Sequence, residues 1–226
     1  MTHGTRFTFD REFGAIQNDL ILMSEKVDWA IERSLYALEE RDLSVAREMV
    51  SFDEEVNALR FKIEEACVVL IATQQPAARD LRAVIAGMHI VIELERMADH
   101  AQGIAKTILM MSTEPNIKIP KKIFKMGELS RHMLRDCIQA FLKRDVDWAR
   151  TIAAQDAEMD MMYRSVFERL VEMMAKRPGI ISGATYLTWC GHNLERIADR
   201  VTNIAEQVIF MNTGDMKELN ITPSGQ

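Results

Sequence analysis

The chain has 226 residues, of which 48% are hydrophobic and 27% charged, with a formal net charge of -6 at pH 7. This length allows one large domain or two of about 100 residues each, and the composition is ordinary for a globular protein with a packed core. The negative charge balance excludes binding of nucleic acid through the phosphate backbone, which requires a basic surface.

Targeting and redox features point to a cytoplasmic protein. The start of the chain has no basic stretch followed by an apolar run, so we expect no secretory signal. The longest apolar run, residues 67–72, is far shorter than the roughly 20 residues that span a bilayer. The 3 cysteines are widely spaced among apolar residues. This setting favours buried, reduced thiols over disulfides or a cysteine-based zinc site.

Apolar residues recur every three or four positions along most of the chain, which is the helical period. Asp10 and Asp42 are candidate N-caps, and Pro76 is expected to end one helix and open the next. The predicted helices span about 10–41, 42–75, 76–111, 120–144, 145–176 and 180–211. The segment from Ser112 to Pro120 lacks the helical period and is predicted to be a linker.

Six long helices with short turns predict an all-α protein that consists of two tandem three-helix bundles in up-down order. No stretch shows the period-two alternation of a strand. We expect the first bundle over residues 10–112, the second over 120–213, and a flexible tail over 214–226.

One segment of the chain occurs twice, as Leu-Glu-Arg-Met-Ala-Asp at 94–99 and as Leu-Glu-Arg-Ile-Ala-Asp at 194–199. Over 94–111 and 194–211, 8 of 18 residues are identical, where unrelated segments would share roughly one. Arg41-Asp42 likewise matches Arg144-Asp145. The repeat therefore covers nearly the whole chain and makes the two bundles related.

Each copy of the motif places a Glu and an Asp four residues apart, so that both carboxylates share one helix face with Cβ atoms about 5–6 Å apart. The preceding helix of each half carries a matching polar pair. The candidate site residues are Asp53, Asn57, Glu95 and Asp99 in the first half and Asp156, Asp160, Glu195 and Asp199 in the second. Similar distances from the intervening turn predict that antiparallel helices bring each set together. Converging carboxylates repel each other unless a cation neutralises them, and such sites suit magnesium, manganese or iron.

Two alternatives remain open. Acidic pairs at this spacing are common on solvated helix faces, so Arg96 and Arg196 could balance them in a metal-free helical scaffold. The other alternative is a carboxylate-bridged metal enzyme, although the Glu-x-x-His motif of ferritin-like di-iron proteins does not occur. A glycine-rich phosphate loop and a nucleophile with a nearby base are also absent from the sequence.

These motifs resemble the PhoU family, the phosphate-transport accessory proteins that restrain the phosphate-starvation response. The resemblance runs from about Phe13 to Met211. It rests on the two duplicated segments, on Gln-Pro-Ala-Ala-Arg-Asp-Leu-Arg at 75–82, and on the Asp-x-x-x-Asn and Asp-x-x-x-Asp pairs. In one departure, Ala98 and Ala198 stand where the family usually has Gly.

The resemblance implies multinuclear metal clusters held by the acidic pairs, and we expect iron, with zinc, manganese or magnesium as alternatives. It further implies a homodimer without catalytic activity that lies peripheral to the membrane on its cytoplasmic face. The implied partners are the ATPase subunit of the phosphate ABC transporter and the phosphate-sensing histidine kinase, whose signalling would be repressed when phosphate is sufficient.

Overall fold

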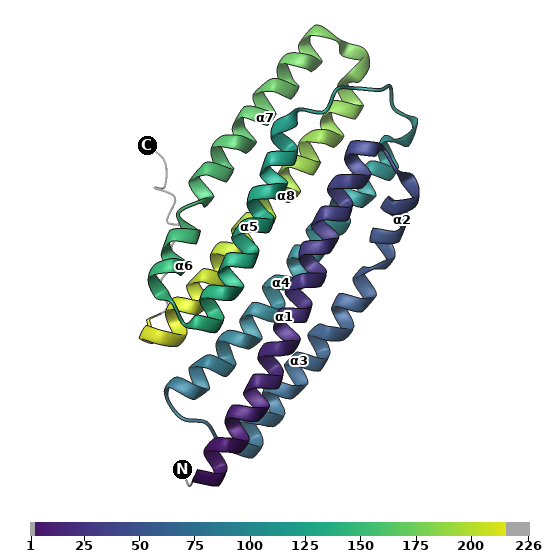
Figure 1. The fold of residues 1–226 in the computed structure, drawn as a ribbon. Coiled ribbons are helices and arrows are strands. Elements are labelled where there is room, and N and C mark those ends of the chain that lie inside the picture. Colours follow the sequence, from purple (N-terminus) through teal and green to yellow (C-terminus); the bar gives the residue numbers. More distant parts are fainter. Residues whose placement is uncertain (1–2, 216–226) are drawn as a thin grey trace.

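The computed structural model describes the backbone of residues 3–215 and, within that range, every side chain except those of residues 3–5 and 53. The elements are α1 His3–Glu40, α2 Leu43–Ser51, α3 Asp53–Gln74, α4 Arg79–Met110, a 3-10 helix Met111–Thr113, α5 Lys121–Lys143, α6 Val146–Ala153, α7 Asp156–Lys176, a 3-10 helix Pro178–Ile180, and α8 Ile181–Thr213. The predicted all-α fold is confirmed (Figure 1). The predicted flexible tail falls largely on residues 216–226, outside the described range. Within that range no helix is both long and apolar enough to cross a bilayer.

Two of the six predicted helices are broken once each, at repeat-equivalent positions. One ends as α2 at Ser51 and resumes as α3 at Asp53, and the other ends as α6 at Ala153 and resumes as α7 at Asp156. An aspartate in the first turn stabilises a new helix N-terminus through the helix dipole, and both new helices begin on one. The predicted polar pairs therefore lie at the starts of α3 and α7 rather than in the middle of longer helices.

The predicted helix starts are partly right. Asp42 and Asp145 cap α2 and α6, and each carboxylate accepts a hydrogen bond of 2.9 Å from a first-turn backbone N–H. The prediction that Asp10 opens the first helix is wrong, because α1 begins at His3 and Asp10 lies inside it. The apolar stripe extends further toward the N-terminus than expected, since Phe9 is buried.

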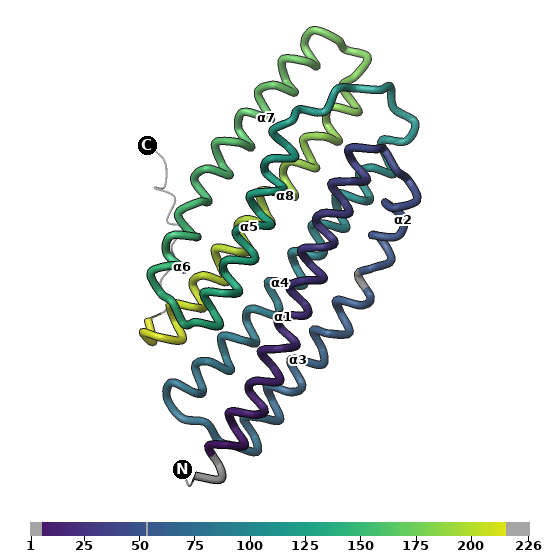
Figure 2. The backbone as a smooth tube through the Cα atoms, viewed as in Figure 1, coloured from purple at the N-terminus to yellow at the C-terminus, as the bar shows by residue number. Residues whose placement is uncertain are grey.

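In each half three long helices run up and down, namely α1, α2–α3 and α4 in the first and α5, α6–α7 and α8 in the second (Figure 1). The halves join along α4 and α8, the most extensively contacting pair of elements, and along α1 and α5. The tube in Figure 2 shows α3 and α7 on opposite outer flanks. The two helix pairs that carry the candidate sites, α3 with α4 and α7 with α8, therefore lie on opposite sides of the molecule.

The contacts between α4 and α8 follow the repeat. Glu93 accepts a hydrogen bond from Arg200 at 3.3 Å, and His100 is hydrogen-bonded to Asn193 at 3.0 Å. Positions 93 and 193 correspond in the repeat, as do 100 and 200. The two contacts therefore join equivalent pairs of positions, with the roles of the two halves exchanged. This exchange shows that α4 and α8 pack antiparallel around a local twofold axis.

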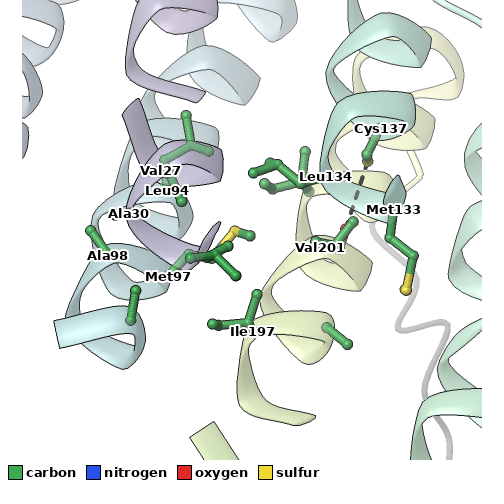
Figure 3. Close-up of a cluster of buried hydrophobic side chains, with 14 of the residues drawn as sticks. Val27, Ala30, Leu94, Met97, Ala98, Met133, Leu134, Cys137, Ile197 and Val201 are labelled. Atoms are coloured by element: carbon green, nitrogen blue, oxygen red, sulfur yellow. Dashed lines mark hydrogen bonds between the residues drawn. The ribbon is translucent and has the colours of Figure 1, made fainter. Parts of the chain in front are cut away.

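Side chains from both halves fill the space near this axis. Met97 and Leu94 of α4, Ile197 and Val201 of α8, and Leu134 of α5 are all completely buried, and Figure 3 shows them between the two bundles. Burial of each such side chain stabilises the fold by about 1.5–3 kcal/mol. The apolar residues of the duplicated motif therefore join the two bundles into one continuous core, while its acids lie on another face.

The second contact between the halves is close and charged. A Cβ atom added to Gly127 of α5 would overlap Cδ1 of Leu35 on α1, so a larger residue there would force the Leu35 side chain to move. Nearby, Arg131 of α5 donates two hydrogen bonds to the carboxylate of Asp28 on α1, at 2.8 and 3.0 Å. Such bidentate pairs are among the stronger charged contacts and fix the register of the two helices.

Candidate metal centres

The second half places its four predicted acids close enough for their charges to act on one another. Asp156 and Asp160 occupy the first turns of α7, and Glu195 and Asp199 lie on the facing side of α8. The charges of Asp199, Asp160 and Asp156 all act on the carboxyl group of Glu195. Because the helices run antiparallel from the turn near Pro178, equal spacing from that turn produces the convergence.

Burial and like charge leave Glu195 poorly stabilised as a carboxylate. Burial, followed by the charge of Asp199, raises the pKa of Glu195 to about 7. Its Oε2 atom is buried and accepts no hydrogen bond from the described residues, although Nδ1 of His192 lies 3.3 Å away. Burial also raises the pKa of Asp199, against the opposing charges of Arg196 and Arg200. A bound cation would relieve this repulsion, so the second half fits a metal ion.

The first half is built differently. Asn57 of α3 and Glu95 and Asp99 of α4 occupy the equivalent positions, and Asp53 begins α3 although its side chain is not described. Glu95 accepts a hydrogen bond of 2.8 Å from the guanidinium group of Arg60. The first half therefore already supplies a positive charge to its central carboxylate and fits a metal ion less well.

The arginines inside the duplicated motif do not act alike. Arg196 donates to Asp199 at 3.2 Å and so partly neutralises the second site. Arg96 instead donates a hydrogen bond to Glu93 at 2.9 Å, and Glu95 accepts its hydrogen bond from Arg60. Both motif arginines are about half exposed, at 51% for Arg96 and 42% for Arg196, and ion pairs near the surface contribute only about 0–1 kcal/mol.

Among the described side chains, no three Asp, Glu, His or Cys residues meet around one point as a ligand set. The electrostatic convergence of the second-half acids is thus a property of the structure, whereas metal ligation by any of the eight residues stays a prediction.

Sequence reasoning missed Arg60 and Glu93. Glu93 is only 8% exposed; it accepts hydrogen bonds from Arg96 on its own helix and from Arg200 and Asn203 of α8. A signal for both residues exists in the repeat, because positions 60 and 93 carry charges where their counterparts, Tyr163 and Asn193, are neutral.

The cysteines are buried, as expected, and His100 is part of the contact between α4 and α8. Cys67, Cys137 and Cys190 are free and buried, and burial raises the pKa of each thiol. His100 is hydrogen-bonded to Asn193, and burial lowers its pKa. Neutral, buried groups of this kind pack the helices and are unsuited to nucleophilic chemistry.

Comparison with known proteins gives a consistent result. The family described as "PhoU domain" matches residues 20–108 and again residues 123–208. A protein of Clostridium acetobutylicum named "Phosphate-specific transport system accessory protein PhoU homolog" is 32% identical, over 96% of this chain and 99% of its own length. A protein of the same name from Streptococcus pneumoniae is 33% identical, over 95% of this chain and 100% of its own.

Solved structures agree with this assignment. The crystal structure of the phosphate transport system regulatory protein PhoU from Streptococcus pneumoniae superposes with a TM-score of 0.87 at 30% identity and covers 93% of this chain and 100% of its own. PhoU from Pseudomonas aeruginosa gives a TM-score of 0.86 at 30% identity, with 92% and 100% covered. Since both halves of the chain match the family domain and the whole fold matches its solved members, this protein belongs to the PhoU family.

Proposed function

We propose that this protein is an accessory regulator of phosphate uptake that links the phosphate ABC transporter, through its ATPase subunit, to the phosphate-sensing histidine kinase. In this proposal it represses kinase signalling when phosphate is sufficient. The observation that carries the proposal is the match to proteins named as phosphate-specific transport accessory proteins over nearly the whole length of both chains.

The proposal includes a position in the cytoplasm, peripheral to the membrane, and a homodimeric state. Its helices lack a membrane-spanning candidate in the described range, which is compatible with recruitment by a membrane-bound partner. The protein acts by binding rather than by catalysis, in keeping with relatives named as accessory or regulatory proteins.

Metal binding forms a second part of the proposal. Asp156, Asp160, Glu195 and Asp199 would hold a cation such as iron, manganese, magnesium or zinc, and the buried Oε2 of Glu195 supports this assignment. The bound ion would supply positive charge that joins α7 to α8. The equivalent first-half set is Asp53, Asn57, Glu95 and Asp99, where Arg60 weakens the case.

Co-purification tests the adaptor role. The tagged full-length protein should retain the transporter ATPase subunit and the cytoplasmic part of the kinase, but should not retain an ATPase subunit from an unrelated ABC transporter. In a strain lacking this protein, a phosphate-starvation reporter should stay active at high phosphate and fall silent on complementation. Retention of neither partner, together with normal repression in the deletion strain, would refute the proposal.

A further inference from the structure

Arg60 ties the two site-bearing helices of the first half together. From α3, its Nη1 donates to Oε1 of Glu95 on α4 at 2.8 Å, and its Nε donates to Oε1 of Glu64 at 3.1 Å. The side chains of Arg60 and Glu95 are 29% and 15% exposed, so the pair lies between the helices rather than in open solvent. The guanidinium group thus lies where a cation between α3 and α4 would bind Glu95.

In the second half the position of Arg60 is taken by Tyr163, since both residues lie seven positions after the first aspartate of their helix. Tyr163 lies close enough for the equivalent carboxyl group to act on it, since burial and then the charge of Glu195 raise the pKa of its phenol. The ring packs over Gly191, where an added Cβ would lie 3.4 Å from the Tyr163 Cδ2 atom. A neutral side chain therefore lies beside Glu195 where a positive one lies beside Glu95.

The two halves consequently differ in local charge. The first half has Arg60 where the second half has Tyr163, and so carries one more positive charge. It also has Asn57 where the second half has Asp160, and so carries one fewer negative charge. Glu64 restores one negative charge to the first half, but its carboxylate is bonded to the same guanidinium group. The second half retains Arg196, which is partly buried and binds Asp199 on the same helix. The charge of Arg200 also acts on Asp199, but its guanidinium group is hydrogen-bonded to Glu93.

A guanidinium group and a metal ion compete for the same carboxylate oxygens. An arginine held by two carboxylates satisfies them through charge-assisted hydrogen bonds and also repels a second cation. The pair of Arg196 with Asp199 lies within one helix and is less buried than the pair of Arg60 with Glu95, which joins two helices. The opposition to a metal ion is therefore stronger in the first half than in the second.

We infer that the two halves of this chain have unequal roles, with Arg60 serving as a built-in cation between α3 and α4 and a divalent metal binding only between α7 and α8. This inference rests on the metal-binding part of the proposed function and on no part of the adaptor role. It assigns Arg60 and Tyr163 as the residues that decide which half takes the metal.

Exchanging the two residues tests the inference. Metal-free full-length protein is titrated with manganese(II), and the bound metal is counted by plasma mass spectrometry and by the electron paramagnetic resonance signal of free manganese. Arg60→Tyr should raise bound manganese to about twice the wild-type amount, because both halves then offer carboxylates to the ion. Tyr163→Arg should weaken manganese binding by roughly 10- to 100-fold, the range typical of changes in the groups around a metal, because the added guanidinium group competes for Glu195 and repels the ion.

A matched control separates local from overall charge. Arg164→Tyr removes the same charge from an exposed position next to Tyr163 and should leave manganese binding unchanged. Circular dichroism verifies folding, and Arg60→Gln and Tyr163→Lys replace any variant that fails to fold.

Three results would each overturn the inference: full manganese binding by Tyr163→Arg, no gain in Arg60→Tyr and Arg60→Gln, or no manganese bound by the wild type. The adaptor role is judged separately by co-purification, so a failed exchange alongside retained partners would count against unequal metal binding alone.

Discussion

Replacing Glu195 with Gln should stabilise the metal-free protein above pH 7. The pKa of Glu195 is raised from its ordinary 4.5 to about 7 in the folded protein, chiefly by burial. Between these values the folded state binds more protons than the unfolded chain, so stability falls as the pH rises through this window. Glutamine keeps the size of the side chain and removes the charge, so the variant should escape this loss.

The size of the gain follows from the shift in the pKa. Moving a carboxyl pKa from 4.5 to about 7 corresponds to on the order of 3 kcal/mol of lost stability once the group is ionised. The side chain is still 19% exposed, and Arg196 and His192 lie nearby, so we expect about 1–2 kcal/mol. For a chain of this length that equals a rise in Tm of roughly 2–8 °C.

Urea unfolding of chelator-treated protein, followed by circular dichroism at about pH 5 and about pH 8, measures the effect. Glu95→Gln, at the repeat-equivalent position, is the matched control. It removes the 2.8 Å partner of Arg60 and should lower stability by about 1 kcal/mol at pH 8. A neutral or destabilising Glu195→Gln at pH 8, or an equal gain at pH 5, would refute the reasoning.

Three further predictions concern the core, the thiols and the metal. Met97→Ala, at a completely buried position near the local axis, should lower the free energy of unfolding by about 2–5 kcal/mol in urea titrations. The control Met161→Ala, at a position that is 67% exposed, should change it by less than about 0.5 kcal/mol. Equal effects of the two substitutions would contradict the shared core. Thiol reagents should leave the native protein unmodified and react only when it unfolds, because burial raises the pKa of Cys67 and Cys190 to about 12. A fast reaction at neutral pH would show that the helices around these thiols open in the native protein. If the metal is structural, chelation should lower Tm, because a ligand that binds only the folded state stabilises it, and an unchanged melting curve after verified metal removal excludes that role.

The fold was largely predictable from the sequence because apolar residues recur at the helical period and because Pro76 marks a helix end. The prediction that Pro76 also opens the next helix is wrong, since α3 ends at Gln74 and α4 begins only at Arg79. The breaks at Phe52 and Gln155 were not predictable in this way, because the apolar period continues across them. An aspartate follows each break, and an aspartate favours a helix N-terminus over a helix interior, but it does not by itself predict a break.

The candidate site was only partly predictable. The spacing from the turn was sufficient to predict that Glu195 approaches Asp156 and Asp160, because residues equally far from a turn lie opposite each other on antiparallel helices. The pairing of Glu95 with Arg60 was hidden, because an arginine one turn after Asn57 reaches either solvent or the neighbouring helix, depending on its side-chain conformation. Comparing mismatches within the repeat, rather than matches, would have singled out this position.

The packing of α4 on α8 has a consequence for synthesis on the ribosome. The apolar face of α4 around Met97 finds its partner about 100 residues later in the chain, at Ile197. At about 5–20 residues per second, the finished first half waits roughly 5–20 s with that face uncovered. During this interval the nascent chain is exposed to aggregation and is a substrate for chaperones, and messages truncated before α8 should yield insoluble product. Slower translation across residues 120–213 should therefore lower the yield of folded protein.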